Sequence, residues 1–104
     1  MVLRTTTLGG TPVVLRESTY AGGGCALWFE DRATGEPFLR LTVNLPRVKL
    51  EPGEFAVKVW SENEPYLPDL RSTGWFVETG REIPVGFVFA PIWRLREAAD
   101  GREG

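Results

Sequence analysis

Histidine is absent from this chain of 104 residues, cysteine occurs once, and no long apolar segment is present. Without histidine, the sequence has neither a Ser-His or Cys-His nucleophile pair nor an imidazole metal ligand. General acid–base chemistry at neutral pH would then depend on a carboxylate, lysine or tyrosine with a shifted pKa. These absences argue against most classes of enzyme, and we expect a protein with no catalytic residue, no cofactor and no bound metal.

The single cysteine, Cys25, rules out an intramolecular disulfide and a cysteine-based zinc site. We interpret it as a small buried residue at the start of a strand, because no base accompanies it that could activate a nucleophile. The acids Glu62, Glu64 and Asp69 match no known calcium-loop spacing, so they predict no metal site either.

The chain also lacks a large excess of charge of either sign. Its formal net charge is only −2, and acidic and basic residues are interleaved. This balance lacks the positive field that nucleic-acid binding requires, so we predict no direct nucleic-acid partner. No apolar run approaches the roughly 20 residues of a membrane span, and the first residues do not resemble a signal peptide. We therefore expect no membrane association and a cytoplasmic location.

Apolar and polar side chains alternate with a period of two, which predicts a sheet-based fold. Gly9 and Gly10 are typical of a two-residue hairpin turn. The predicted strands are residues 2–8, 11–20, 25–30, 37–45, 55–60, 75–78, 85–89 and 92–95. One short helix is predicted over 63–73, where Pro65 suits the first turn and Gly74 the end.

The expected fold class is α+β, with a mostly antiparallel β-meander sheet of about five to seven strands and one short helix packed at one side. A chain of this length is expected to form a single globular domain over residues 1–96. The polar segment 97–104 is expected to be a disordered tail.

The same alternation predicts which side chains form the core. The residues expected to be buried together are Leu41, Val43, Phe55, Val57 and Phe87. Phe89 shares a face with Phe87 and is assigned to the core, whereas Trp93 is expected to point away from its neighbour Ile92. We interpret Trp93 as a candidate dimer contact, so a homodimer is one of the expected assemblies.

A polar corner follows the strand predicted over 55–60. Trp60 ends that strand, and Glu62, Asn63 and Glu64 come directly after it. An aromatic anchor ringed by acids is typical of a site that binds a basic protein surface. In the alternative interpretation, Trp60 packs against the helix while the acids favour its positively polarised end.

A second candidate surface is the outer face that strands 37–45 and 55–60 would form if they pair. The side chains predicted to line it are Arg40, Thr42, Asn44, Lys58 and Trp60. Such a face could bind an anion, a nucleotide-like signalling molecule or a loop of a partner. The alternative is a face that is solvated or covered by the helix.

Several short motifs resemble a known family. They are Glu36-Pro37-Phe38, the run LTVNL over 41–45, Thr79-Gly80-Arg81, Gly86-Phe87-Val88 with Pro91 behind it, and an early loop with Tyr20, Gly23 and Gly24. Together they resemble the signature of a small family of uncharacterised bacterial proteins carried on conjugative elements, plasmids and prophages. The resemblance covers about residues 13–95. The chain departs from it at 60–64, where WSENE replaces a step like Asp-Thr-Asn-Asn.

No function is established for that family, so the resemblance implies no catalytic residues. Mobile-element proteins of this size often inhibit host defence by binding. We therefore predict a small non-catalytic binding protein of a phage or mobile element that occludes a host defence protein, as anti-CRISPR or anti-restriction proteins do. The alternative is a module that sequesters a small nucleotide-like signal, for which Arg40 and Lys58 would matter most. A third hypothesis is a minor enzyme that uses carboxylates alone.

Overall fold

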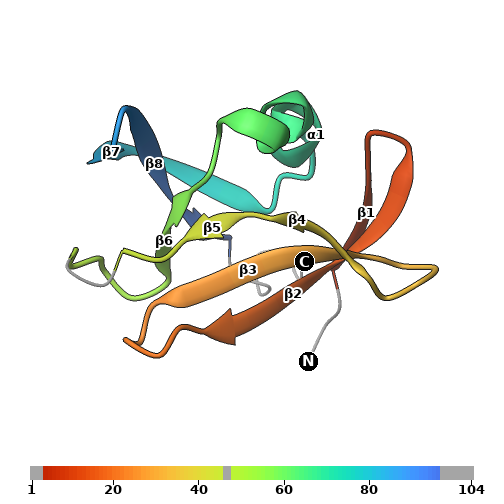
Figure 1. Cartoon of the computed structure of the whole chain (residues 1–104), viewed down its shortest axis with the longest axis horizontal. Coiled ribbons are helices and arrows are strands. Elements are labelled where there is room, and N and C mark those ends of the chain that lie inside the picture. Colours follow the sequence, from red (N-terminus) through yellow and green to blue (C-terminus); the bar gives the residue numbers. More distant parts are fainter. Residues whose placement is uncertain (1–3, 46–47, 97–104) are drawn as a thin grey trace.

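Two four-stranded antiparallel sheets pack around one main core in the computed structural model, which describes residues 4–45 and 48–96 (Figure 1). The strands are β1 (Arg4–Leu8), β2 (Thr11–Thr19), β3 (Cys25–Asp31), β4 (Pro37–Arg40), β5 (Thr42–Val43), β6 (Glu54–Val57), β7 (Phe76–Val85) and β8 (Val88–Leu95). The first sheet has the order β1-β2-β3-β4 and the second β5-β6-β8-β7. The predicted class, mostly antiparallel sheet with one short helix, is confirmed, but eight strands form two sheets rather than one meander. The tail predicted over 97–104 lies outside the described residues.

One segment of chain serves both sheets because it turns a corner at Leu41. β4 pairs with β3 in the first sheet, and β5 pairs with β6 in the second. The backbone N–H of Leu41 donates to the carbonyl of Leu27 at 3.1 Å, and its own carbonyl accepts from the N–H of Lys58 at 2.8 Å. The strand predicted over 37–45 is therefore two short strands joined by a bend, as occurs where a strand changes sheets.

The bend changes which side chains face inward. Leu39 and Leu41 lie in the main core, as predicted. After the bend, Thr42 is the buried residue, whereas Val43 lies half-buried in a separate cluster. The predicted place of Val43 in the core is thus wrong, because period-two alternation does not continue through a bend.

The main core contains side chains from both sheets and from the helix. Its buried members are Leu8, Val13, Leu15, Leu27, Phe29, Leu39, Leu41, Phe55, Val57, Leu70, Phe76 and Trp93. The predicted burial of Leu41, Phe55 and Val57 is confirmed. Trp93 is 1% exposed and packs on Phe76, with 5.5 Å between the ring centroids.

The aromatic residues near the C-terminal end are arranged oppositely to the prediction. Trp93, predicted to face outward as a dimer contact, is a central core residue, while Phe87 is fully exposed and Phe89 is 57% exposed. The reason is local: Gly86 and Phe87 form the two-residue turn between β7 and β8, and Gly86 has a φ of +62°. A strand over 85–89 therefore does not form, and the alternation read across it assigned the wrong faces.

The helical segment is short and contains two helices of different type. It consists of a 3-10 helix, η1 (Ser61–Tyr66), followed by α1 (Leu67–Ser72). Pro65 lies within η1 and Pro68 in the first turn of α1, where a missing N–H breaks no internal hydrogen bond. Within residues 4–45 and 48–96, no helix is long and apolar enough to cross a membrane.

The helix is attached to the turn between β1 and β2, so that it closes one side of the molecule (Figure 1). Leu70 is fully buried in the main core, and the carboxylate of Asp69 accepts a hydrogen bond from the N–H of Gly9 at 2.8 Å. A Cβ on Gly9 would come within 2.7 Å of the Tyr66 ring, so glycine is required there by contact as well as by its φ of +55°.

Trp93→Ala should lower the free energy of unfolding by about 3–5 kcal/mol, because it leaves a large space in the main core. Phe87→Ala should change it by less than about 0.5 kcal/mol, because the Phe87 ring lies in solvent. Urea denaturation followed by circular dichroism measures both values. Equal losses in the two variants would contradict the burial assigned to these rings.

Candidate functional site

The polar corner predicted at 60–64 is divided between surface and interior. Lys58 and Glu62 form an ion pair with 2.6 Å between Nζ and Oε2, and this contact is the main cause of a lowered pKa for the Glu62 carboxyl. Glu64 is exposed on the same 3-10 helix. Both acids are thus available to a partner at the surface, although Glu62 already has a cationic neighbour.

Asn63, predicted as part of the binding corner, is fully buried. Its Nδ2 donates to the carbonyl of Arg40 at 2.7 Å and to the carbonyl of Lys58 at 3.0 Å. These carbonyls lie on either side of the corner formed by β4, β5 and β6. Asn63 therefore has a structural role, and in this structure a partner could not reach its side chain.

Trp60 is half-buried. Its ring lies in the apolar cluster on the outer face of the second sheet, whose buried centre is Ala56, Ala90 and Ile92. Ala56 is 1% exposed because the cluster covers it. Trp60 is thus one edge of an apolar surface rather than an isolated anchor.

The second predicted surface does not form. Arg40 ends β4 and belongs to the first sheet, Thr42 faces inward, and Asn44 lies exposed after β5. Only Lys58 and Trp60 remain close in the chain after β6. The corner at Leu41 is the physical reason, because it places residues before and after it on different sheets.

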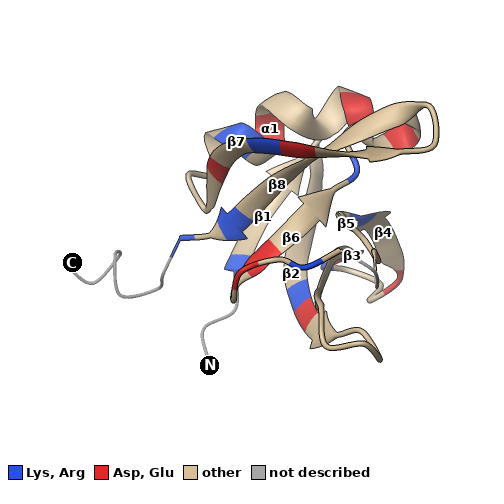
Figure 2. Cartoon of the chain, turned by 90° about the vertical axis from the view of Figure 1, so that its left-hand side faces the viewer, with Lys and Arg blue, Asp and Glu red and all other residues tan. Residues whose placement is uncertain are grey.

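The outer face of the second sheet is the most distinctive surface of the molecule. Half-buried side chains surround its centre: Val43, Leu45, Leu50, Trp60, Ile83 and Val85. Beyond Val85, Phe87 lies in the β7–β8 turn, and Phe89 follows on β8, where it pairs with Pro84 and faces the opposite side of the sheet from Ile83 and Val85. These two are the exposed large hydrophobic residues among those described. No charged residue occurs over 83–93, and the turn end of the hairpin is uncoloured in the charge view (Figure 2). We call this face together with the turn the apolar face.

Charge is confined to the other end of the same hairpin. Arg81, in the irregular part of β7, pairs with the carboxylate of Glu54 on β6. Arg94 of β8 is the cross-strand neighbour of Glu54. The apolar face therefore has one charged border here and a second one at Glu62 and Glu64.

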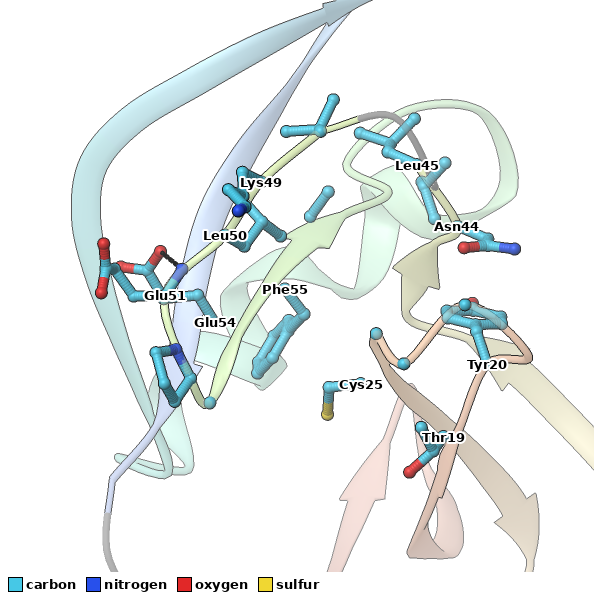
Figure 3. A pocket seen from close by; sticks show the side chains of 18 of the residues that line it. Thr19, Tyr20, Cys25, Asn44, Leu45, Lys49, Leu50, Glu51, Glu54 and Phe55 are labelled. Carbon is cyan, nitrogen blue, oxygen red and sulfur yellow. Dashed lines mark hydrogen bonds between the residues drawn. The ribbon is translucent and has the colours of Figure 1, made fainter.

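A cleft with a volume of about 760 Å³ opens between the loop 20–24 and the segment 48–56 (Figure 3). The Tyr20 hydroxyl is 2.9 Å from Oγ1 of Thr42, and Phe55 forms part of the wall. The glycine-rich part of 20–24 is a tight loop, as predicted, in which the N–H of Gly23 donates to the carbonyl of Tyr20.

Cys25 lies in this cleft, half-buried at the start of β3. Burial raises the pKa of its thiol, and the negative charge of Glu17 raises it further. A raised pKa keeps the sulfur protonated at neutral pH and makes it a poor nucleophile. Nowhere in the described part of the chain do three or more histidine, cysteine, aspartate or glutamate side chains gather as metal ligands.

Phe87 and Phe89 were predicted as core residues but lie at the surface. Glycine at position 86, between β-branched Val85 and Val88, was a usable signal of a two-residue turn. No protein-family model, curated protein or solved structure matches the chain. The resemblance to the mobile-element family therefore stays a prediction.

Asn63→Asp should lower the free energy of unfolding by about 3 kcal/mol or more, because a buried carboxylate would replace the donor between two carbonyl oxygens. Asn44→Asp makes the same chemical change at an exposed position and should cost less than about 0.5 kcal/mol. Thermal and urea unfolding of the two variants measure both losses of stability. If both were equally stable, the clamp assigned to Asn63 would be wrong.

Cys25 should react with iodoacetamide at pH 8 more slowly than a free cysteine, because its raised pKa leaves less thiolate. Glu17→Gln removes the negative charge nearby, so it should lower the pKa and increase the alkylation rate at that pH. Glu36→Gln, in the exposed loop after β3, serves as the control. An unchanged alkylation rate in Glu17→Gln would show that Glu17 does not raise the pKa of Cys25.

Proposed function

We propose that this chain is a non-catalytic binding protein that occludes a partner protein with its apolar face. The observation that carries the proposal is the full exposure of Phe87 at the turn that borders the uncharged outer face, together with the 57% exposure of Phe89 on the opposite face of the same hairpin end. Large contiguous apolar patches are uncommon on monomeric proteins and mark interaction surfaces when they occur. Aromatic side chains are also enriched among the residues that dominate binding energy.

The position of the two rings suits them to anchor a partner. Phe87 lies at the tip of a two-residue turn, where a concave partner surface could enclose it. The turn is short and belongs to a regular antiparallel hairpin, with Pro84 paired to Phe89 and Val85 paired to Val88. A hairpin of this kind is preorganised, so little conformational entropy is lost when it binds.

The borders of the apolar face define the kind of partner that would fit. Glu62 and Glu64 are exposed next to Trp60, so the partner is proposed to have basic residues around an apolar pocket. Charges at the rim mainly steer association, whereas the buried aromatic contacts hold the complex together.

The wider biological role is proposed from the sequence. We propose a phage or mobile-element protein that inhibits a host defence protein, of the anti-restriction or anti-CRISPR type, on the basis of the resemblance described above.

Immobilised protein should capture a partner from host lysate, and the double variant Phe87→Ala, Phe89→Ala should lose it. Removing a central aromatic anchor typically costs about 2 kcal/mol or more, which corresponds to about a thirtyfold weaker complex. Thr5→Ala, Thr7→Ala on β1 is the matched control, because both positions are exposed and distant in sequence from the turn. Equal capture by wild type and by the phenylalanine variant would disprove the interface.

The inhibitory role requires a separate measurement on the same variants. Expression of the protein in cells with an active restriction or CRISPR system should raise the plating efficiency of a targeted phage. The phenylalanine double variant should fail to do so, and the threonine variant should succeed. Capture of a partner without any change in plating would leave a binding protein whose target is not a defence system.

A further inference from the structure

A row of three side chains crosses the outer face of the first sheet. Arg16 of β2, Trp28 of β3 and Arg40 of β4 are direct cross-strand neighbours. Each follows a leucine of the main core, so the alternation of the strands turns all three outward. The strands lie side by side in the order β2, β3, β4 (Figure 1). This row lies on a different sheet from the apolar face.

Glu30 fixes two members of the row. Its Oε2 accepts a hydrogen bond from the Trp28 indole N–H at 3.0 Å, and its Oε1 accepts from Nε of Arg16, also at 3.0 Å. These two hydrogen bonds are the main causes of a lowered pKa for the Glu30 carboxyl, so it is ionised at neutral pH. The indole and the first guanidinium are thus held in place before any ligand arrives.

Within the described residues, the Arg40 guanidinium makes no ion pair and the Trp28 ring makes no aromatic pair. Arg40 takes part in none of the ion pairs there. Trp28 forms no aromatic pair, and the cation–π contact found is between Arg71 and Trp93. The half-buried indole therefore presents a ring surface that no described aromatic or cationic group covers.

We propose that the Arg16–Trp28–Arg40 row binds a free mononucleotide, with its base stacked on Trp28 and its phosphate held by Arg40. Bases of every kind stack on aromatic side chains, and guanidinium groups match phosphate with two parallel hydrogen bonds. Two inter-strand spacings give a row about 10 Å wide, which suits one nucleotide rather than several.

Electrostatics favours a small ligand over a nucleic-acid strand. Locally, two arginines and one glutamate leave an excess positive charge for a single phosphate. Over the whole chain, however, the net charge is −2, which does not supply the extended positive field that a strand requires. The proposed ligand is therefore the free nucleotide, and the titration below distinguishes it from a single strand.

The test is a titration of nitrogen-15-labelled protein with AMP, followed through the indole N–H signal of Trp28. That signal is assigned from its disappearance in Trp28→Phe. AMP should shift it in a saturable manner, and Arg40→Ala should weaken the binding at least about tenfold. Arg32→Ala removes the same charge from the exposed loop after β3 and should bind AMP as wild type does.

Three further ligands separate the contributions. Adenosine and inorganic phosphate should each bind at least about tenfold more weakly than AMP, because each supplies only one of the two contacts. A ten-nucleotide strand of deoxyadenosine should bind no more tightly per nucleotide than AMP. The proposal is overturned if millimolar AMP leaves the Trp28 signal unmoved or if phosphate alone matches AMP. It is equally overturned if Arg32→Ala weakens binding as much as Arg40→Ala, or if affinity rises steeply with strand length.

Discussion

The corner at Leu41, together with the Asn63 amide that holds it, is the constraint on which the other surfaces depend. A single chain segment supplies the edge strand of both sheets, and Leu41 gives its N–H to one sheet and its carbonyl to the other. Asn63 donates to the carbonyls of Arg40 and Lys58 and so ties the start of the bend to the end of β6. Because buried carbonyl groups without donors are costly, this arrangement stabilises one bend geometry over others. It also separates Arg40, which ends β4 of the first sheet, from Trp60, which packs on the outer face of the second.

That separation produces two outer faces with different chemistry. Antiparallel sheets commonly bury one face and hydrate the other, so the arginine-rich face of the first sheet needs no cover. The second sheet is unusual because its outer face is also apolar, with Ala56 and Ile92 almost fully buried and Phe87 fully exposed. Each 100 Å² of apolar surface removed from water would contribute about 2.5 kcal/mol, before the costs of association. The ligands proposed for the two faces differ accordingly: a protein surface for one, a small anion with a planar group for the other.

The local structure could largely be predicted from the sequence, but the assignment of faces could not. Alternation, glycine turns and proline positions were enough to predict antiparallel strands and one short helix. They failed for Val43 and Phe87, because a bend and a two-residue turn each interrupt the period of two on which face assignment depends. Asn63 looked like a surface residue because a sequence shows polarity but not burial, and its two acceptors come from other parts of the fold. Likewise, Trp28 gains its significance from the register that places arginines on both sides of it.

The acidic residues show how the structure distributes its charge between folding and binding. Glu54 pairs with Arg81, and Glu30 holds Arg16 and Trp28, so these carboxylates are engaged in positioning other side chains. Glu62 is paired as well, yet its side chain remains 68% exposed and can exchange Lys58 for a basic partner residue. Surface pairs of this kind contribute little to stability, so an exchange of partners has a low cost. The acidic border can therefore exchange its ion-pair partner easily, and it lies beside a rigid apolar face. This arrangement suits the proposed partner, because the acids would orient a basic protein before the aromatic contacts form.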